Sequence, residues 1–219
     1  PMRGLEIANE LVRTHKAAFA YPDWIRTRSK RAIPDDTLFT DQWHLRNTGQ
    51  GGGTTGEDIN VISVWDTYRG TADEVIAIVD DGLEIHHPDL EDNVRSDLCW
   101  DYVDNEADTT DGDHGTSCAG VAAGRGFNGL GISGSAPNAR LAGHRILSNS
   151  SGVTDSDIAS ALTDDHSIID IYSNSWGPAD GGYLLDGPSP LILAALANGV
   201  ASGRGGLGSI YLWAGGNGY

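Results

Sequence analysis

An apolar run from Val75 to Val79 ends directly in two carboxylates, Asp80 and Asp81, followed by Gly82. A short, uninterrupted and largely β-branched run is typical of a strand that is buried on both faces of a parallel sheet. Helical patterns alternate with such runs along the chain, which predicts βαβ units and an α/β fold. We expect strands at 74–79, 140–147, 168–174 and 209–214, and helices at 6–19, 59–68, 114–123, 155–162 and 189–203.

The carboxyl ends of parallel strands are where an α/β sheet gathers its functional side chains. Asp80 lies at one such end, and His114 begins a later helix with small residues behind it. An aspartate that orients a histidine, and a histidine that takes a proton from a nucleophile, are two members of a Ser-His-Asp triad. Ser117 lies on the same helix as the histidine and cannot face the imidazole squarely, so we reject it as the third member. No convincing serine follows before Tyr219.

The charge balance of the 219 residues is strongly acidic, with a net charge of −17. This balance argues against a nucleic-acid partner, whereas calcium ligation, basic peptide substrates and plain solubility all fit it. No apolar stretch reaches the length of a membrane span. Cys99 and Cys118 are the only cysteines and form neither a disulfide framework nor a zinc pattern, so we expect two buried thiols.

The first 35 residues differ from the rest of the chain. The predicted helix at 6–19 is followed by a basic stretch, 26–31, in an otherwise acidic sequence, and then by an extended linker, 32–36. Exposed basic linkers are natural cleavage sites. On charge alone, a solvated charge run is the simpler interpretation.

Short motifs are spread over the chain from about residue 36 to its last residue: Asp80-Asp81-Gly82, His87-Pro88-Asp89-Leu90, His114-Gly115-Thr116, Asn138-Ala139-Arg140, Ser173-Asn174-Ser175-Trp176-Gly177-Pro178, the glycine-rich run 203–209 and Trp213-Ala214-Gly215-Gly216-Asn217-Gly218. Together they resemble the subtilisin-like serine proteases, and within them the kexin/furin proprotein convertase branch. The resemblance implies a three-layer α/β/α fold with a parallel sheet, truncated here at the C-terminus. It also implies a calcium-dependent serine endopeptidase of the secretory pathway or the extracellular space.

For the catalytic centre, the resemblance implies that Asp80 holds the imidazole and that His114 acts as general base and then as general acid. Asn217 resembles the asparagine whose amide donates to the developing oxyanion, although its glycine neighbours also suit a simple turn. The nucleophilic serine of the family lies far beyond that asparagine. We therefore expect the serine after Tyr219, and we expect this chain alone to be inactive.

For substrate binding, the resemblance implies extended pairing along Ser175-Trp176-Gly177 and carboxylates that select basic side chains. Asp81 and Asp111 match positions used for the residue second from the scissile bond, and Asp186 matches one used farther out. Asp180 matches a ligand of a second calcium site behind the first pocket. Surface solvation is the alternative for each aspartate.

For calcium, the resemblance implies one tight site made of carboxylates, an amide and loop carbonyls, the oxygen ligands that a hard cation prefers. Loop 101–108 is acidic. It could bind a further ion, and simple solvation of its carboxylates is an equally good interpretation. The adjacent His86 and His87 leave a zinc hydrolase as a minor alternative. The expected calcium ligands are the side chains of Asp36, Asp89 and Asn128 and the carbonyls of Arg125, Leu130 and Ile132.

The basic stretch resembles the end of a propeptide that the enzyme cuts itself, between Arg31 and Ala32. Residues 1–31 are then the propeptide tail, and 32–219 the N-terminal portion of the peptidase domain. The partners expected are peptides or proteins with basic residues, and the chain's own propeptide. Ile158 stands where a helix carboxylate is expected, which leaves a degradative subtilisin without dibasic preference open. A non-catalytic, calcium-stabilised binding protein on the same fold is the other alternative.

Overall fold

The computed structural model describes residues 2–22, 32–149, 151–178, 181 and 187–218. The chain divides into two compact units, Pro1–Lys30 and Arg31–Tyr219. Among the helices of the described residues, none combines the length and the apolar character that a bilayer span requires.

The first unit contains helix α1 (Met2–Arg13), which begins and ends earlier than the predicted range 6–19. The helix ends because His15 adopts a left-handed φ of 56° and the Lys16 N–H turns back to the Leu11 carbonyl at 3.0 Å. A left-handed residue of this kind commonly closes a helix. The predicted helix is therefore present, but its position in the sequence is shifted by several residues.

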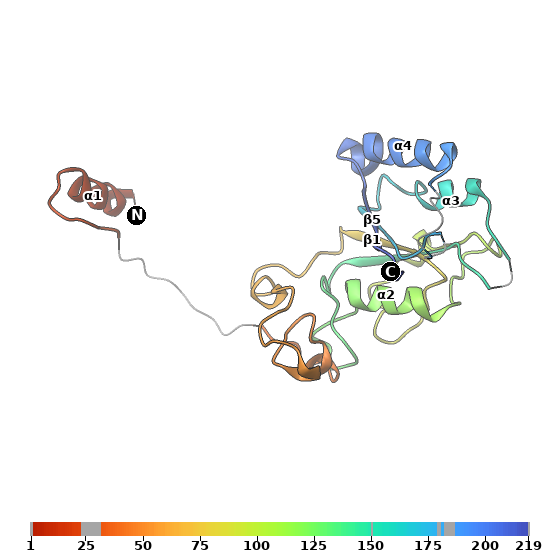
Figure 1. The fold of residues 1–219 in the computed structure, drawn as a ribbon, viewed down its shortest axis with the longest axis horizontal. Helices are drawn as coiled ribbons and strands as arrows, with labels where there is room; N and C mark the ends of the chain where they lie inside the picture. The colour runs from red at the N-terminus through yellow and green to blue at the C-terminus, as the bar shows by residue number, and fades with distance from the viewer. Residues whose placement is uncertain (1, 23–31, 150, 179–180, 182–186, 219) are drawn as a thin grey trace. The chain divides into compact units, whose positions relative to one another are not determined.

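The second unit is built on a five-stranded sheet whose strands are β1 (Val75–Asp80), β2 (Trp100–Asp101), β3 (Arg140–Arg145), β4 (Ile171–Asn174) and β5 (Ile210–Trp213). All neighbouring strands are parallel, in the order β2-β3-β1-β4-β5 (Figure 1). β1 lies at the centre, between β3 and β4. The predicted strands are confirmed within a few residues, whereas β2 was missed because two residues give no period-two pattern.

β1 is buried on both faces, and its alternate side chains enter two separate cores. One core contains Ala161 of α3 (Asp155–Ala161), and the other contains Ala119 of α2 (Asp113–Ala123). Figure 1 shows α2 on one side of the sheet, with α3 and α4 (Pro190–Gly206) on the other. The predicted three-layer α/β/α arrangement is confirmed. The β1 side chains in the first core are Val75, Ala77 and Val79, and those in the second are Ile76 and Ile78.

Four buried apolar residues of segment 36–68 form a smaller cluster of their own: Phe39, Leu45, Ile62 and Trp65. The predicted helix over 59–68 is wrong: only a 3₁₀ turn, Val61–Ser63, forms there. Asn60 precedes this turn with a left-handed φ of 56°, and β-branched residues within it disfavour a longer helix. Trp65 holds the segment by packing on Phe39 and by donating its Nε1–H to the Ser135 carbonyl at 2.9 Å.

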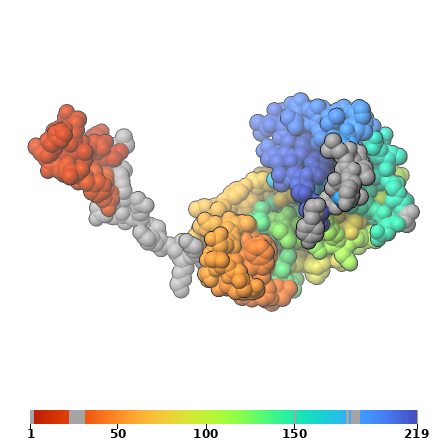
Figure 2. Space-filling model, in the orientation of Figure 1, coloured from red at the N-terminus to blue at the C-terminus, as the bar shows by residue number. Residues whose placement is uncertain are grey.

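The surface formed by α4 and β5 carries exposed apolar side chains. Figure 2 shows these two elements in blue. Leu207 is 80% exposed and Leu212 is 53% exposed. Among the described residues, β5 pairs with β4 alone, so it forms an edge of the sheet.

Candidate functional site

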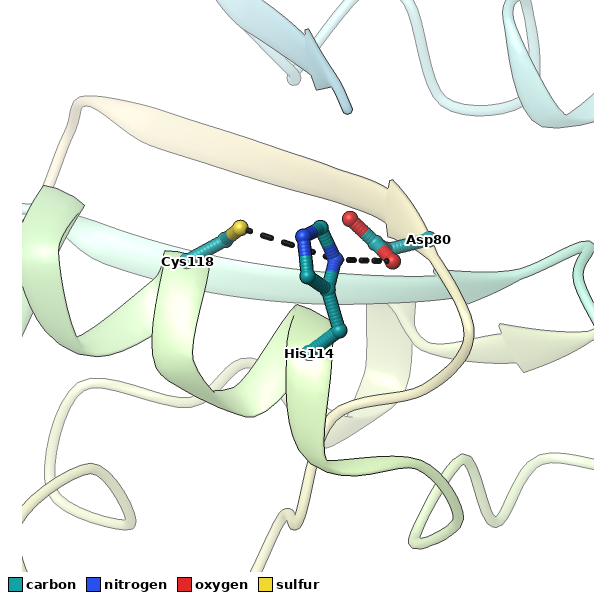
Figure 3. A group of neighbouring side chains, drawn as sticks. All are labelled: Asp80, His114 and Cys118. Carbon is teal, nitrogen blue, oxygen red and sulfur yellow. Dashed lines mark hydrogen bonds and ion pairs between the residues drawn. The ribbon is translucent and has the colours of Figure 1, made fainter. Parts of the chain in front are cut away.

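A buried aspartate and an exposed histidine form the centre of the site (Figure 3). Asp80 is the last residue of β1 and its side chain is 1% exposed, while His114 is the second residue of α2 and its side chain is 58% exposed. The His114 Nδ1 lies 2.8 Å from Asp80 Oδ1. A carboxylate acceptor at this nitrogen favours the tautomer with the proton on Nδ1, which leaves the lone pair on Nε2.

Burial and hydrogen bonding shift the pKa of both partners. Desolvation raises the pKa of Asp80, opposed by hydrogen bonds from His114 and from the Asp81 N–H. The hydrogen bond to Asp80, and then the charge of that carboxylate, raise the pKa of His114. The two directions act oppositely on a charged pair, because burial disfavours the Asp80 carboxylate while the hydrogen bond to it favours the protonated imidazole. The raised pKa of His114 favours the imidazolium, which is the form a histidine takes after it accepts a proton.

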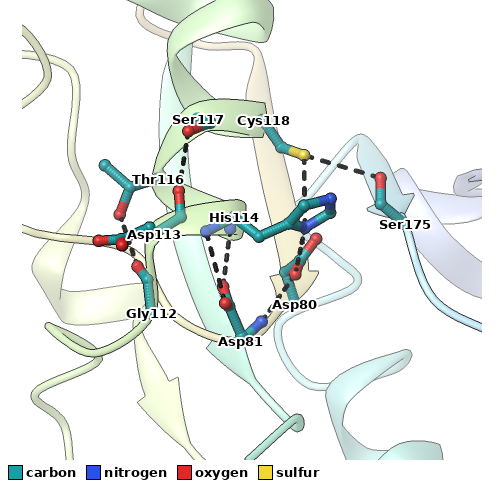
Figure 4. Close-up of polar contacts among 10 residues, drawn as sticks. Asp80, Asp81, Gly112, Asp113, His114, Thr116, Ser117, Cys118 and Ser175 are labelled. Atoms are coloured by element: carbon teal, nitrogen blue, oxygen red, sulfur yellow. Dashed lines mark hydrogen bonds and ion pairs between the residues drawn. The ribbon is translucent and has the colours of Figure 1, made fainter.

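A second carboxylate, Asp81, holds the start of α2 (Figure 4). Its Oδ1 accepts from the Gly115 N–H at 2.7 Å, and its Oδ2 accepts from the His114 N–H at 3.4 Å. These bonds satisfy donors of the first helical turn and place negative charge at the positive end of the helix dipole. Gly112, at φ 87°, permits this approach because a Cβ there would collide with the Asp81 carboxylate.

Ser117 and Cys118 also lie on α2, close to His114, and both carry a side chain that could act as a nucleophile. The Ser117 hydroxyl donates to the Asp113 carbonyl at 2.8 Å, which agrees with its rejection as a nucleophile. Cys118 is only half-buried, so the expectation of two buried thiols holds for Cys99 and is wrong for Cys118. Desolvation raises the pKa of the Cys118 thiol, which disfavours the nucleophilic thiolate.

A pocket of about 510 Å³ adjoins the Asp80–His114 pair. Asp81, Asp111 and Ser175, all predicted to bind substrate, are among its lining residues. Arg145 lines it as well and was missed from the sequence. Arg145 is the last residue of β3, as Asp80 is of β1, but the strand predicted at 140–147 runs past Arg145 and so gave no strand-end signal there.

Arg145 carries three ion pairs in this wall. Its Nη1 lies 2.6 Å from Asp101 Oδ2 and 2.6 Å from Asp104 Oδ2, and its Nη2 lies 2.6 Å from Asp111 Oδ2. The side chains of Arg145 and Asp101 are 6% and 2% exposed, so the first pair is a buried one. In the acidic loop 101–108, which was considered for a further ion, Asp101 is therefore already paired with the Arg145 guanidinium.

The other predicted substrate and oxyanion residues follow β4 and β5. Ser175, Trp176 and Gly177 come directly after β4, and the Trp176 ring contacts Trp213 of β5 edge-on at 5.4 Å between ring centroids. Asn217 lies in the loop after β5 and is exposed. Trp176, Gly177 and Asn217 are not among the residues that line the pocket. Asp180, Asp186 and Arg31 lie outside the described residues.

The predicted calcium ligands are brought together around loop 125–132. Asp36 is 5% exposed and accepts the N–H groups of Phe127 and Asn128, each at 3.0 Å. Asp89 is 3% exposed and accepts the Asn128 Nδ2–H at 3.0 Å and the Ile132 N–H at 2.8 Å. Neither carboxylate has a basic side chain within ion-pair distance in the described part of the chain.

This loop fits a hard cation on two further observations. Within the described ranges, the carbonyl oxygens of Arg125, Leu130 and Ile132 accept no hydrogen bond. Gly131 has a φ of 47°, and a Cβ at that position would collide with the Asp89 carboxylate. Two buried carboxylates that pair with no basic side chain of the described residues, with carbonyl oxygens nearby, are the donor set that calcium prefers.

The histidine-based zinc alternative has no support. The His87 Nδ1 accepts the Asp89 N–H at 3.2 Å. Of the residues that the structure describes, only Asp80, His114 and Cys118 form a group whose ligand atoms all lie within 4.8 Å of one another. His86 and His87 do not take part in such a group.

Asp80 at the end of a strand and His114 at the start of a helix supply two members of a Ser-His-Asp arrangement on a three-layer α/β/α fold. The chain belongs to the subtilase family, whose model matches residues 71–219. Among curated proteins, it is 44% identical over 191 residues to neuroendocrine convertase 2 of Rattus norvegicus, covering 84% of this chain and 30% of the relative. It is also 44% identical over 210 residues to a PC3-like endoprotease, variant B, of Hydra vulgaris, covering 91% of this chain and 29% of the relative. The chain thus spans about a third of these relatives' length.

Solved structures agree with this assignment. The serine protease of Aeromonas sobria is 32% identical with a TM-score of 0.73, covering 88% of this chain and 34% of that structure. A protease of Pseudoalteromonas arctica is 25% identical with a TM-score of 0.66, covering 85% of this chain and 60% of that structure.

Proposed function

We propose that the protein containing this chain is a calcium-dependent serine endopeptidase that cleaves after basic residues. The observation that carries the proposal is the 2.8 Å contact between a buried Asp80 and an exposed His114 at the carboxyl edge of a parallel sheet. Membership of the subtilase family supports the same chemistry.

In the proposed mechanism, Asp80 orients the imidazole and stabilises its charged form without taking the proton itself. His114 Nε2 accepts the proton of a serine hydroxyl as that oxygen attacks the peptide carbonyl, and later returns it to the leaving amine. We assign the serine to a part of the protein beyond this chain. Asn217 donates its side-chain amide to the oxyanion as charge develops there.

Calcium is proposed as a structural ion. Asp36, Asp89 and Asn128 would hold it by side chain, and three carbonyls of loop 125–132 would complete its shell. When bound, the ion would neutralise two buried carboxylates and so fix the loop against segment 36–39. No catalytic step depends on it.

The preference for basic residues is supported by the carboxylates in the pocket wall. Asp81 and Asp111 both line that wall, although Asp81 also holds α2 and Asp111 also binds Arg145. Asp157, next to Ile158, accepts the Thr154 N–H at 2.8 Å and caps α3. We therefore propose selection of a basic residue close to the cut, without strict multibasic selectivity.

Residues 1–31 are proposed as the tail of a propeptide, and 32–219 as the start of the peptidase domain. The division into units next to Arg31 supports this boundary. We further propose that the protein acts in the secretory pathway or outside the cell, where calcium is abundant enough to fill an oxygen-ligand site.

The test uses the full-length protein, with His114→Ala as the matched variant. A fluorophosphonate probe should label a serine in the unaltered protein, and a peptide library should be cleaved after Arg or Lys. His114→Ala should lose both, because the base is removed. Calcium-stabilised protein without labelling or cleavage would favour a binding protein on this fold, and cleavage without basic preference would favour a degradative protease.

A further inference from the structure

Asn149 lies in the loop between β3 and α3 and begins a sequence pattern that the proposed function does not use. It is followed by Ser150 and Ser151, so a hydroxyl residue comes two positions after the asparagine and no proline lies between them. Among the asparagines of the chain, only Asn149 has serine or threonine at this spacing. This is the acceptor pattern for N-linked glycosylation, in which an oligosaccharide is attached to the asparagine amide nitrogen.

The acceptor residues are accessible. Asn149 and Ser151 are both exposed to solvent, and neither belongs to a helix or a strand. The loop also has open space beside it, because a Cβ at Gly152 would meet no atom of the described residues within 4 Å other than those of its chain neighbours. A bulky and hydrated oligosaccharide is accommodated at a surface loop of this kind. The sequence pattern therefore coincides with a position where the modification fits.

Both ends of this loop are fixed to the fold. The N–H groups of Ile146 and Leu147 donate to the Asp80 carbonyl at 2.9 and 3.2 Å. At the other end, the side chain of Thr154 caps the start of α3. Because Leu147 is bonded to the strand that carries the catalytic aspartate, Asn149 is held within two residues of that strand.

Asn149 is also one of the residues that line the pocket of about 510 Å³ beside the Asp80–His114 pair. We infer that Asn149 carries an N-linked oligosaccharide, and that this glycan lies at the mouth of the substrate pocket. A glycan at this position limits the approach of folded proteins to His114 and leaves room for an extended, flexible peptide. The modification rests on the proposed secretory-pathway location, and its effect on substrates rests on the proposed peptidase activity.

The attachment is a group transfer from a lipid-linked oligosaccharyl diphosphate. A bond forms between Asn149 Nδ2 and the anomeric carbon of the first sugar, while the bond between that carbon and the diphosphate oxygen breaks. The lipid diphosphate leaves with the electron pair of the broken bond, and the amide nitrogen gives up one proton to a base. The Ser151 hydroxyl is needed because it is part of the pattern that the transferase recognises. Nothing is oxidised or reduced.

The experiment directs the full-length protein into the secretory pathway of cultured animal cells and analyses the Asn149 peptide by mass spectrometry. A peptide N-glycosidase should release a glycan from this peptide and convert the asparagine to aspartate. Asn149→Gln and Ser151→Ala should both lose the glycan, whereas Ser151→Thr should keep it because threonine supplies the same hydroxyl. Asn105→Gln, at an exposed asparagine without the pattern, is the control and should keep the glycan at Asn149. An unmodified Asn149 in the secreted protein, or a glycan retained in Ser151→Ala, would overturn the site.

A second readout compares kcat/KM for a short basic peptide with kcat/KM for a folded protein that carries the same basic site. Asn149→Gln should raise the value for the folded protein severalfold and leave the value for the peptide unchanged. Ser151→Ala should give the same result while keeping the Asn149 side chain, which separates the effect of the glycan from that of the pocket wall. Equal ratios with and without the glycan would overturn its effect on substrates. A glycosylated Asn149 in a protein without peptidase activity would refute the proposed function and leave the site standing, and an active protein with a bare Asn149 would do the reverse.

Discussion

The Arg145 guanidinium binds Asp111 through an Nη2–Oδ2 distance of 2.6 Å, while its Nη1 binds Asp101 and Asp104. Arg145 and Asp101 are paired residues at the ends of β3 and β2, so the ion cluster ties two strand ends to the loop before α2. A basic substrate side chain that approaches Asp111 therefore meets an existing ion pair. Selection of a basic substrate by Asp111 therefore depends on whether its carboxylate can bind the substrate side chain and Arg145 at the same time.

Replacing Arg145 by Met should destabilise the fold by about 3–5 kcal/mol, because Asp101 is left as a buried and unpaired charge. Urea unfolding of the full chain measures this loss. Adding Asp101→Asn to Arg145→Met should recover part of it. The control is Arg95→Met, which breaks the more exposed pair with Asp97 and should cost at most about 1 kcal/mol. Equal losses in the two single variants would contradict the buried-pair account.

The pKa of His114 should lie above its ordinary value, and Asp80→Asn should lower it. A raised pKa in the folded state means that the pair stabilises the fold below the unfolded pKa, and that this stabilisation is lost as pH rises through the folded pKa. General-base activity has the opposite pH dependence, appearing only above the folded pKa. NMR titration of the His114 ring protons tests the shift. Asp113→Asn is the matched control and should leave the titration in place.

Calcium should raise the melting temperature of the chain, because the ion binds the native loop and not the unfolded chain. At a calcium concentration 100 times Kd, the stabilisation is about 2.7 kcal/mol. Asp89→Ala should remove this dependence, while Glu91→Ala, an exposed acidic neighbour, should keep it. Melting curves with calcium and with chelator make the comparison. Identical curves for the unaltered chain in both solutions would refute the site.

Self-cleavage of the full-length protein should leave Ala32 as the new N-terminus. The Ala32 N–H already lies 2.7 Å from Asp66 Oδ1, so cleavage would place an ammonium beside that carboxylate. N-terminal sequencing should find this start in the unaltered protein and in a Lys16→Ala control. Arg31→Ala and His114→Ala should both remain unprocessed. A mature start elsewhere, or normal processing of His114→Ala, would mean that another protease cuts or that the basic stretch is only a linker.

The sequence predicted what depends on local periodicity and on strand ends. Asp80 and His114 were predicted to meet because one follows a buried strand and the other lies at the start of a helix of small residues. In the structure the His114 Nδ1 lies 2.8 Å from Asp80 Oδ1. The ligand set around Asp36 and Asp89 was predicted from motif resemblance rather than from physics.

The features that sequence reasoning missed depend on contacts between distant segments. The aspartates around Arg145 all lie within residues 101–111, far from Arg145 in the sequence, so no local pattern indicates which of them it binds. The partial burial of the Cys118 thiol depends on neighbours distant in the sequence, such as Ser175 after β4, which hydropathy does not report. The failed helix over 59–68 has a similar cause, because Trp65 is held by packing against Phe39 and Phe127 rather than by helical neighbours.

β1 contributes to both cores, since its odd-numbered and even-numbered residues pack against helices on opposite faces of the sheet. The last residue of the same strand is Asp80. A change of volume in either layer would shift the same strand and thus the same carboxylate. Substitutions at Ala119 or Ala161, on helices of opposite layers, should therefore alter the Asp80–His114 distance. A substitution that changes side-chain volume in one helix layer could then be compensated by a substitution in the opposite layer that returns β1, and with it Asp80, to its place.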